Sequence, residues 1–431
     1  MRITLDRRWR VLLRRHGPGS AIWRRRFAMG LGAISIGLVA LLFAWLADQA
    51  SHYFDLFANR FRWAPLLGTP SAFAAIAWLT RRIAPEATGS GIPQVIAAAG
   101  NPKRIAQHLI SLKVALWKCV STIAGLLVGA SVGREGPTVQ ISAAILGWYA
   151  RLFRTPMRAS MLIAGGAAGV AAAFNTPLAG VTFAIEELAD AYEQRVALLV
   201  MTTIVIAGIV SLGLAGNYVY FGEVSQTLTV SAVLRIAPVA GVAGGLAGGL
   251  FARAMLGLSA SRDRWLPVFR DRPVWWALFC GIIVAGLGVA TGLTWGTGYS
   301  SARAIIDGTN APYWFGPAKF LTTLATALSG LPGGIFAPSL ATGAGLGTLL
   351  RCIFPSDPGS AIVLLGLVAY FTGVVRAPLT AVIIVVEATA SRGLILPLFL
   401  SAIIAHMVSS FVCKERLYHG LAQRWRTEAP S

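Results

Sequence analysis

Long apolar stretches without a charged residue alternate along this chain with short clusters of basic residues. A helix that crosses the apolar core of a bilayer needs about 20 apolar residues. Several charge-free windows reach that length: Ala28–Ala47, Ala159–Ile185, Val196–Phe221, Val274–Ala302 and Gly393–Cys413. The pattern predicts an all-α polytopic membrane protein, with the lipid bilayer as a partner.

Other apolar stretches are short and are bounded by Gly, Pro or a charge, for example residues 119–133 and 136–150. Non-helical backbone at membrane depth is tolerated only where it is buried in protein or lines a cavity. Broken helices of this kind are typical of transporters. We therefore expect a transporter or a channel with tilted and interrupted helices.

The composition agrees with a membrane protein, because only 13% of the 431 residues are charged, against about 25% in soluble proteins. The net charge of +20 could indicate a nucleic-acid partner. Nine arginines, however, fall within residues 1–26, directly before the first apolar window. Basic residues beside a membrane segment are held in the cytoplasm. We expect both termini to be cytoplasmic and no nucleic-acid partner.

Cysteine and histidine give no sign of a metal or redox site. The four cysteines are scattered, and the histidines His52, His108 and His406 are isolated. No disulfide framework, metal spacing or Ser/His/Asp set is visible. We expect no cofactor, no metal and no enzymatic activity.

The sequence repeats itself. Residues 118–137 read KCVSTIAGLLVGASVGREGP, and residues 319–338, which begin 201 positions later, read KFLTTLATALSGLPGGIFAP. The same offset joins Pro177 to Pro378 and Glu186 to Glu387. Such self-similarity predicts two homologous halves, about 30–215 and 230–415, within a single transmembrane domain covering 1–431. Repeats of this kind are a common transporter plan, and these residues do not decide between parallel and inverted halves.

Three Gly/Pro-rich motifs interrupt the apolar stretches at Gly89–Pro93, Gly133–Pro137 and Gly333–Pro338. Proline in a first turn sacrifices no needed donor, and glycine lets backbone approach a ligand. Free N–H groups and the helix dipole attract anions at helix N-termini. The motifs therefore predict three helix starts that converge around a bound anion.

These motifs, GSGIP, GREGP and GGIFAP, together with Tyr418 near the end of the chain, resemble the signatures of the CLC chloride channels and proton/chloride antiporters. The resemblance implies the CLC fold, with two inverted halves of tilted and broken helices. It also implies a homodimer with one anion pathway per subunit, in the inner membrane of a bacterium. The few residues after Tyr418 leave no room for CBS domains, which is typical of the prokaryotic type.

The resemblance also assigns an anion site. It places the central anion on the hydroxyls of Ser90 and Tyr418 and on the backbone N–H groups of Ile335 and Phe336. A second anion would lie further out, on N–H groups around Arg134, Glu135 and Gly136. Two other interpretations stay open, since Ser90 could be an N-cap and Tyr418 an interfacial aromatic.

Glu135 and Glu187 are the expected proton carriers. An ionised Glu135 at a helix N-terminus would itself compete with chloride, so protonation would open the site, as the family's external gate does. Glu187 matches the internal proton-transfer glutamate of the antiporters. The alternatives are a dipole-stabilising acid or an Arg134 partner for Glu135, and a solvated helix-end acid for Glu187.

Two other charged positions are interpreted through the repeat. Glu186 recurs as Glu387, which favours a structural role for both. Lys118 resembles in its placement a lysine of several transporters of the family, which implies that it tunes the field around the gate. Its repeat equivalent Lys319 favours a packing or interfacial role equally.

The function expected from these residues is proton-coupled chloride antiport. A passive voltage- or pH-gated chloride channel on the same fold is the alternative, and it would leave Glu187 without a proton role. Ser90 matches the members of the family that prefer chloride.

Overall fold

The computed structural model describes residues 21–188, 194–216, 219–265 and 272–427. Within these residues the chain is helical, as predicted, and the only β-type pairing is one bridge between Gly133 and Gly334. The first 20 residues of the predicted basic cytoplasmic segment lie outside the described ranges.

The helices of the first half, in chain order, are α2 (Ala21–Arg60), α3 (Pro65–Ile83), the 3₁₀ turn η1 (Pro85–Ala87), α4 (Ile92–Gly100), α5 (Ala106–Leu109), α6 (Leu112–Leu126), α7 (Glu135–Leu152), α8 (Ala159–Phe174), α9 (Pro177–Phe183), the π-helical segment η2 (Ala184–Leu188) and α10 (Gln194–Ala215). Those of the second half are α11 (Val230–Trp265), α12 (Pro273–Thr291), α13 (Tyr299–Ile306), α14 (Phe315–Leu328), α15 (Phe336–Ile353), α16 (Gly359–Val375), α17 (Pro378–Thr389), the 3₁₀ turn η4 (Arg392–Leu394), α18 (Ile395–Val412) and α19 (Leu417–Thr427).

Four helical segments are long and apolar enough to cross a membrane, among the residues described: Trp23–Arg60, Val230–Ser259, Pro273–Thr291 and Arg392–Val412. The charge-free window 159–185 does not form one spanning helix. Asn175 adopts a left-handed conformation that ends α8, and Pro177 opens α9. A search for charge-free windows could not detect this break, because neither residue is charged.

Helices at corresponding places of the repeat pack on each other across the molecule. The contacting pairs are α3 with α12, α7 with α15, and α9 with α17. Gly133 and Gly334 exchange backbone hydrogen bonds, 2.7 Å from Gly133 N to Gly334 O and 2.8 Å in return. A reciprocal bond between residues 201 positions apart is the arrangement expected on a local two-fold axis.

Glu186 and Glu387 cap helices in opposite halves, which confirms their expected structural role. Glu186 Oε2 accepts hydrogen bonds from Thr380 N (2.7 Å) and Thr380 Oγ1 (2.8 Å) at the start of α17. Glu387 Oε2 accepts one from Ala179 N (2.8 Å) at the start of α9. Each carboxylate thereby satisfies N–H groups that have no partner within their own helix.

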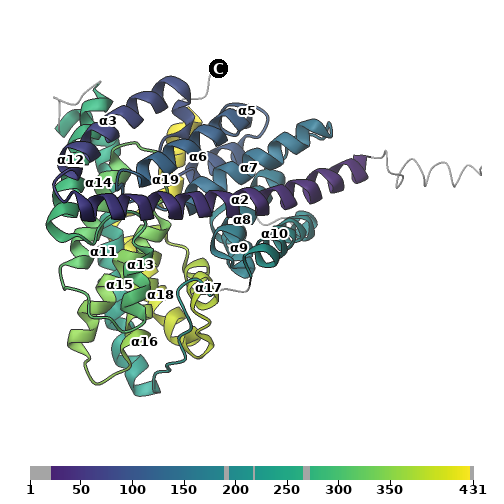
Figure 1. Cartoon of the computed structure of the whole chain (residues 1–431). Coiled ribbons are helices and arrows are strands. Elements are labelled where there is room, and N and C mark those ends of the chain that lie inside the picture. Colours follow the sequence, from purple (N-terminus) through teal and green to yellow (C-terminus); the bar gives the residue numbers. More distant parts are fainter. Residues whose placement is uncertain (1–20, 189–193, 217–218, 266–271, 428–431) are drawn as a thin grey trace, which may run out of the picture.

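The last helix, α19, lies within the helical body. Figure 1 shows it, in yellow, beside the helices of the first half. It packs mainly on α4 and also contacts α11 and α16. This position carries Tyr418, at the start of α19, into the interior of the molecule, where the side chain is fully buried.

Small residues allow several helices to pack very closely, as is common in membranes. Helix α11 meets α16 through Gly244 and Gly248. A Cβ atom built on Gly248 would lie 2.5 Å from the carbonyl carbon of Gly373. Gly257, on the same helix, has no such neighbour within 4 Å.

The pair Gly248 and Gly257 tests this packing. Gly248→Ala should lower the thermal midpoint in detergent, because the added methyl forces α11 away from α16. Gly257→Ala should leave the midpoint unchanged or raise it, since alanine favours a helix by up to about 1 kcal/mol over glycine. Equal midpoints for the two variants would contradict this account of the packing.

Candidate functional site

The three Gly/Pro-rich motifs each begin a helix, as predicted, and the helix starts meet. Helix α4 begins at Ile92, α7 at Glu135 and α15 at Phe336. Gly333 N donates to Gly89 O at 3.1 Å, so the first and third motifs are in direct contact. The second and third motifs are joined by the Gly133–Gly334 bridge. Free N–H groups of three helices therefore point into one small region of the interior.

Glycine is required where α4 and α7 approach each other. Gly91 has φ +105°, in the region that favours glycine, and its Cβ would lie 2.8 Å from Gly136 O. A Cβ on Gly136 would lie 2.4 Å from Ser90 Oγ. The absence of side chains lets the Ser90 hydroxyl lie directly against the first turn of α7.

Ser90 and Tyr418 come together, although they are far apart in sequence. Helix α19, which carries Tyr418, packs on α4, which begins two residues after Ser90. Both hydroxyl oxygens are buried, and neither has a hydrogen-bond partner among the described residues. The Tyr418 ring is 6.0 Å from the ring of Phe336, between centroids. Buried hydroxyl groups are usually paired, so this pair has hydrogen-bonding capacity left for a ligand.

The two structural alternatives for these residues are wrong. Gly91, rather than Ser90, occupies the N-cap position of α4, and no side chain caps that helix. Tyr418 is fully buried, so it is not an aromatic at the membrane interface.

Glu135 reaches from one helix start to another. Its side chain is fully buried, and Oε2 accepts a hydrogen bond from Ala337 N (3.4 Å) in the first turn of α15. Oε1 has no hydrogen-bond partner among the described residues. The carboxylate therefore occupies the kind of position that an anion would take at a helix N-terminus.

Arg134 pairs with a residue other than Glu135. Its Nη1 donates to Asp48 Oδ2 (2.7 Å) and to Ala44 O (2.6 Å), both on α2. The side chain of Asp48 is 63% exposed. The alternative in which Arg134 simply neutralises Glu135 is thus not the arrangement that the structure has.

Glu187 is fully buried, so the alternative of a solvated helix-end acid is also wrong. It lies in the π-helical segment η2, a kind of distortion that often marks functional sites. Glu187 Oε2 is 3.3 Å from Arg416 Nη2, and Oε1 is 3.4 Å from His419 Nδ1. Glu186, its neighbour, points instead to α17.

Tyr418 lies near the contacts of both candidate proton carriers. Its ring packs on that of Phe336, whose neighbour Ala337 binds the carboxylate of Glu135. His419 follows Tyr418 directly in α19 and contacts Glu187. The predicted anion ligand therefore lies in the same region as both acids.

Lys118 packs as its repeat equivalent does. The buried Lys118 ammonium donates to Ala87 O (2.6 Å) and Gly89 O (2.7 Å), the backbone that leads into Ser90. Lys319 donates to Thr294 O (2.9 Å) and Gly296 O (2.8 Å) in the second half. Of the two interpretations from the sequence, these contacts favour packing, and they give Lys118 the task of holding the Ser90 turn.

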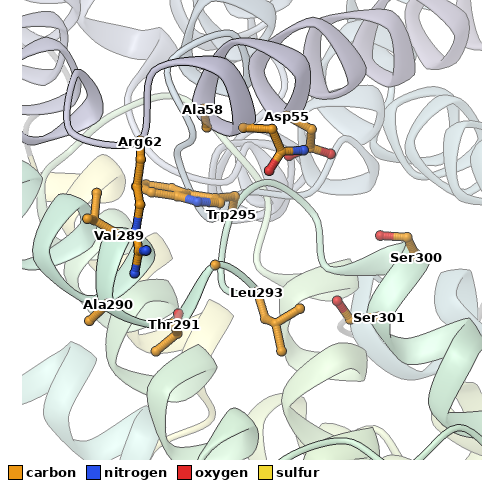
Figure 2. Close-up of a pocket in the computed structure, with 13 residues that line it drawn as sticks. Asp55, Ala58, Arg62, Val289, Ala290, Thr291, Leu293, Trp295, Ser300 and Ser301 are labelled. Atoms are coloured by element: carbon orange, nitrogen blue, oxygen red, sulfur yellow. The ribbon is translucent and has the colours of Figure 1, made fainter.

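A separate pocket of about 410 Å³ lies where the end of α2 faces the connection between α12 and α13 (Figure 2). Asp55 of α2 and Arg62, in the turn after α2, line it together with Trp295 and with Ser300 and Ser301 of α13. None of the predicted site residues lines this pocket.

Sequence reasoning missed four residues of the site. Ala337 was not singled out beside Phe336, and Asp48, Arg416 and His419 carried no motif. Only the fold brings Arg416 and His419 to Glu187, because about 230 residues separate them along the chain.

In the described part of the chain, no cluster of three or more His, Cys, Asp or Glu side chains could hold a metal.

The helix-terminus site inside an all-α body with membrane-spanning helices defines an integral membrane ion-transport protein. Residues 72–410 match the family described as "Voltage gated chloride channel". The chain belongs to this family, as the sequence resemblance indicated.

Solved structures of CLC proteins share the fold. A slow cyanobacterial Cl⁻/H⁺ antiporter matches with a TM-score of 0.81 and 23% identity, covering 94% of this chain and 98% of its own. A eukaryotic CLC transporter matches with a TM-score of 0.75 and 22% sequence identity, and the match covers 93% of this chain and 74% of that transporter. A CLC-type fluoride/proton antiporter matches with a TM-score of 0.73 and 24% sequence identity, and the match covers 90% of this chain and 96% of that antiporter. The predicted CLC fold is confirmed.

The two buried lysines offer a matched test of the site. Lys118→Met and Lys319→Met should each lower the thermal midpoint, because each removes hydrogen bonds from a buried turn. Only Lys118→Met should weaken chloride binding, by about tenfold if the Ser90 contribution of about 1.4 kcal/mol is lost. Titration calorimetry of both variants measures this. Equal chloride affinities would mean that Lys118 does not position the anion site.

Proposed function

We propose that this protein is a proton-coupled chloride antiporter. The observation that carries the proposal is the position of the Glu135 carboxylate. Glu135 begins α7, but its side chain reaches the start of α15, where it accepts a hydrogen bond from Ala337 N. When ionised, it competes with chloride for the same N–H groups. When protonated, it loses its attraction for that site and leaves it to the anion.

The proposed central anion lies between the hydroxyls of Ser90 and Tyr418 and the N–H groups of Ile335 and Phe336. The hydroxyls of Ser90 and Tyr418 have no hydrogen-bond partner among the described residues, which supports this assignment. The N–H groups of Arg134, Glu135 and Gly136, at the start of α7, hold the anion further out. A site built from N–H and O–H donors binds chloride without a lysine or arginine that would slow its release.

Glu187 favours antiport over passive conduction. A fully buried carboxylate at membrane depth is costly and usually functional. Glu187 contacts Arg416 and His419, and His419 is the chain neighbour of Tyr418, which supports a proton path to Glu135 that passes the anion site. Two of the similar solved structures are described as proton-coupled antiporters, of chloride and of fluoride. A passive channel would not require this buried acid.

Chloride is the proposed substrate because Ser90 supplies the hydroxyl typical of chloride-preferring members. We place the protein in the inner membrane of a bacterium, with both termini in the cytoplasm. We further propose a single domain of two halves, assembled as a homodimer with one pathway per subunit. The chain needs no enzymatic activity or cofactor for this function.

Glu135→Gln tests the gate. The amide cannot ionise, so chloride should still cross while proton transport falls at least about a hundredfold, a common effect of losing an acid–base group. Chloride efflux from proteoliposomes is recorded together with external pH, with an uncoupler control. Proton transport that stays coupled in Glu135→Gln would refute the proposal. Glu223→Gln, at an exposed position, is the matched control.

Glu187→Gln separates the two candidate functions. An antiporter should lose proton transport and keep chloride flux, because the internal proton carrier is gone. A passive channel should show the same chloride current and no proton movement with either residue at position 187. The same vesicle assay, with the wild type measured in parallel, decides between them.

A further inference from the structure

We propose that His419 transfers protons between Glu187 and water on the cytoplasmic side. This inference rests on the proposed antiport function and adds the residue through which the buried internal acid exchanges its proton. No sequence motif indicates this role for His419, and the role follows from the contact of its side chain with Glu187.

The geometry gives His419 access to both partners of such a transfer. Glu187 is fully buried and cannot exchange protons with bulk water directly. His419 Nδ1 is 3.4 Å from Glu187 Oε1, close to hydrogen-bond distance. The imidazole side chain is 29% exposed, so it connects the buried carboxylate to the surface of the chain.

Arg416 cannot take this role, although it also contacts Glu187. A guanidinium stays protonated and has no acceptor atom. Arg416 Nη2 engages Glu187 Oε2 and also donates to Glu186 O and Arg376 O, both at 3.1 Å. Arg416 is therefore a positioning residue. It holds Glu187 Oε2, so that Oε1 faces His419.

The chemistry of imidazole suits a relay at this position. One ring nitrogen can accept a proton while the other donates one. The Glu187 carboxylate faces Nδ1 of His419 and is also held by Arg416, whose guanidinium group binds the carbonyl oxygens of Glu186 and Arg376. Glu187 is thus held between a permanent cation and a side chain that can pass a proton on.

The transfer moves one proton and no other group. The O–H bond at Glu187 Oε1 breaks as a bond forms to His419 Nδ1, which leaves a carboxylate and an imidazolium. The Nε2–H bond then breaks, and its proton passes to water. Before the next transfer, the neutral ring exchanges its remaining proton from Nδ1 to Nε2 through water. Uptake from the cytoplasm runs the same steps in reverse.

His419→Gln and His419→Asn, in the full-length protein in proteoliposomes, test the proposal. Each should lower the rate of proton transport about tenfold or more, the low end of the effect of losing a proton-transfer group. His108→Gln, at an exposed position on α5, is the matched control and should match the wild type. Wild-type proton transport in both His419 variants would overturn the inference.

A second background separates proton transfer from a structural role. In Glu187→Gln, no proton reaches His419, so adding His419→Gln should not change the remaining chloride flux. Such non-additivity is expected for residues that act in one step. Slower chloride flux in the double variants with either Gln or Asn at position 419 would place His419 in the anion pathway or the fold, and would overturn the proposal.

The outcomes also separate this inference from the proposed function. A wild-type protein that moves chloride without protons refutes antiport and, with it, the relay. A wild-type protein that couples both ions, while its His419 variants couple equally well, refutes the relay alone.

Discussion

The structure depends on one constraint: helix N-termini meet deep inside an apolar protein, where their N–H groups need partners. The reciprocal Gly133–Gly334 bridge fixes this meeting point, and the contact of Gly333 with Gly89 adds the start of α4. An unsatisfied N–H group in an apolar interior costs several kcal/mol. The converging termini therefore favour an anion, and Glu135 supplies one from the chain itself.

The two halves share a scaffold and differ at the positions that carry chemistry. Lys118 and Lys319 hold equivalent turns, and Glu186 and Glu387 cap equivalent helices in opposite halves. Glu135, however, corresponds to Phe336 under the 201-residue offset. One helix start thus carries a carboxylate, while the other leaves its N–H groups to receive it. Duplication explains why the two halves share their turns and helix caps. Divergence at this position explains why only one of the two helix starts carries a carboxylate.

Much of this arrangement could be predicted from the sequence. The Gly/Pro motifs predicted the starts of α4, α7 and α15, because glycine and proline act locally on the backbone. The repeat predicted a structural role for Glu186, because the same residue type recurs at the equivalent position, Glu387. The boundary at Asn175 does not interrupt a charge-free window, because asparagine carries no charge, although its left-handed backbone ends α8.

The contacts of the acids could not be predicted in the same way. The pairing of Arg134 with Asp48 depends on how α2 crosses the start of α7, and no local pattern records that crossing. His419 and Arg416 reach Glu187 only because α19 packs against α4 inside the body. The π-helical turn, which points Glu187 and Glu186 to different partners, is likewise a product of tertiary packing.

The central claim is that the carboxylate of Glu135 occupies an anion position at the start of α15. Bromide, which scatters anomalously and resembles chloride, reports this directly in crystals of the wild type and of Glu135→Ala. The account predicts a bromide peak beside Ala337 N in the variant and the carboxylate there in the wild type. A variant with no bromide at that position would contradict it.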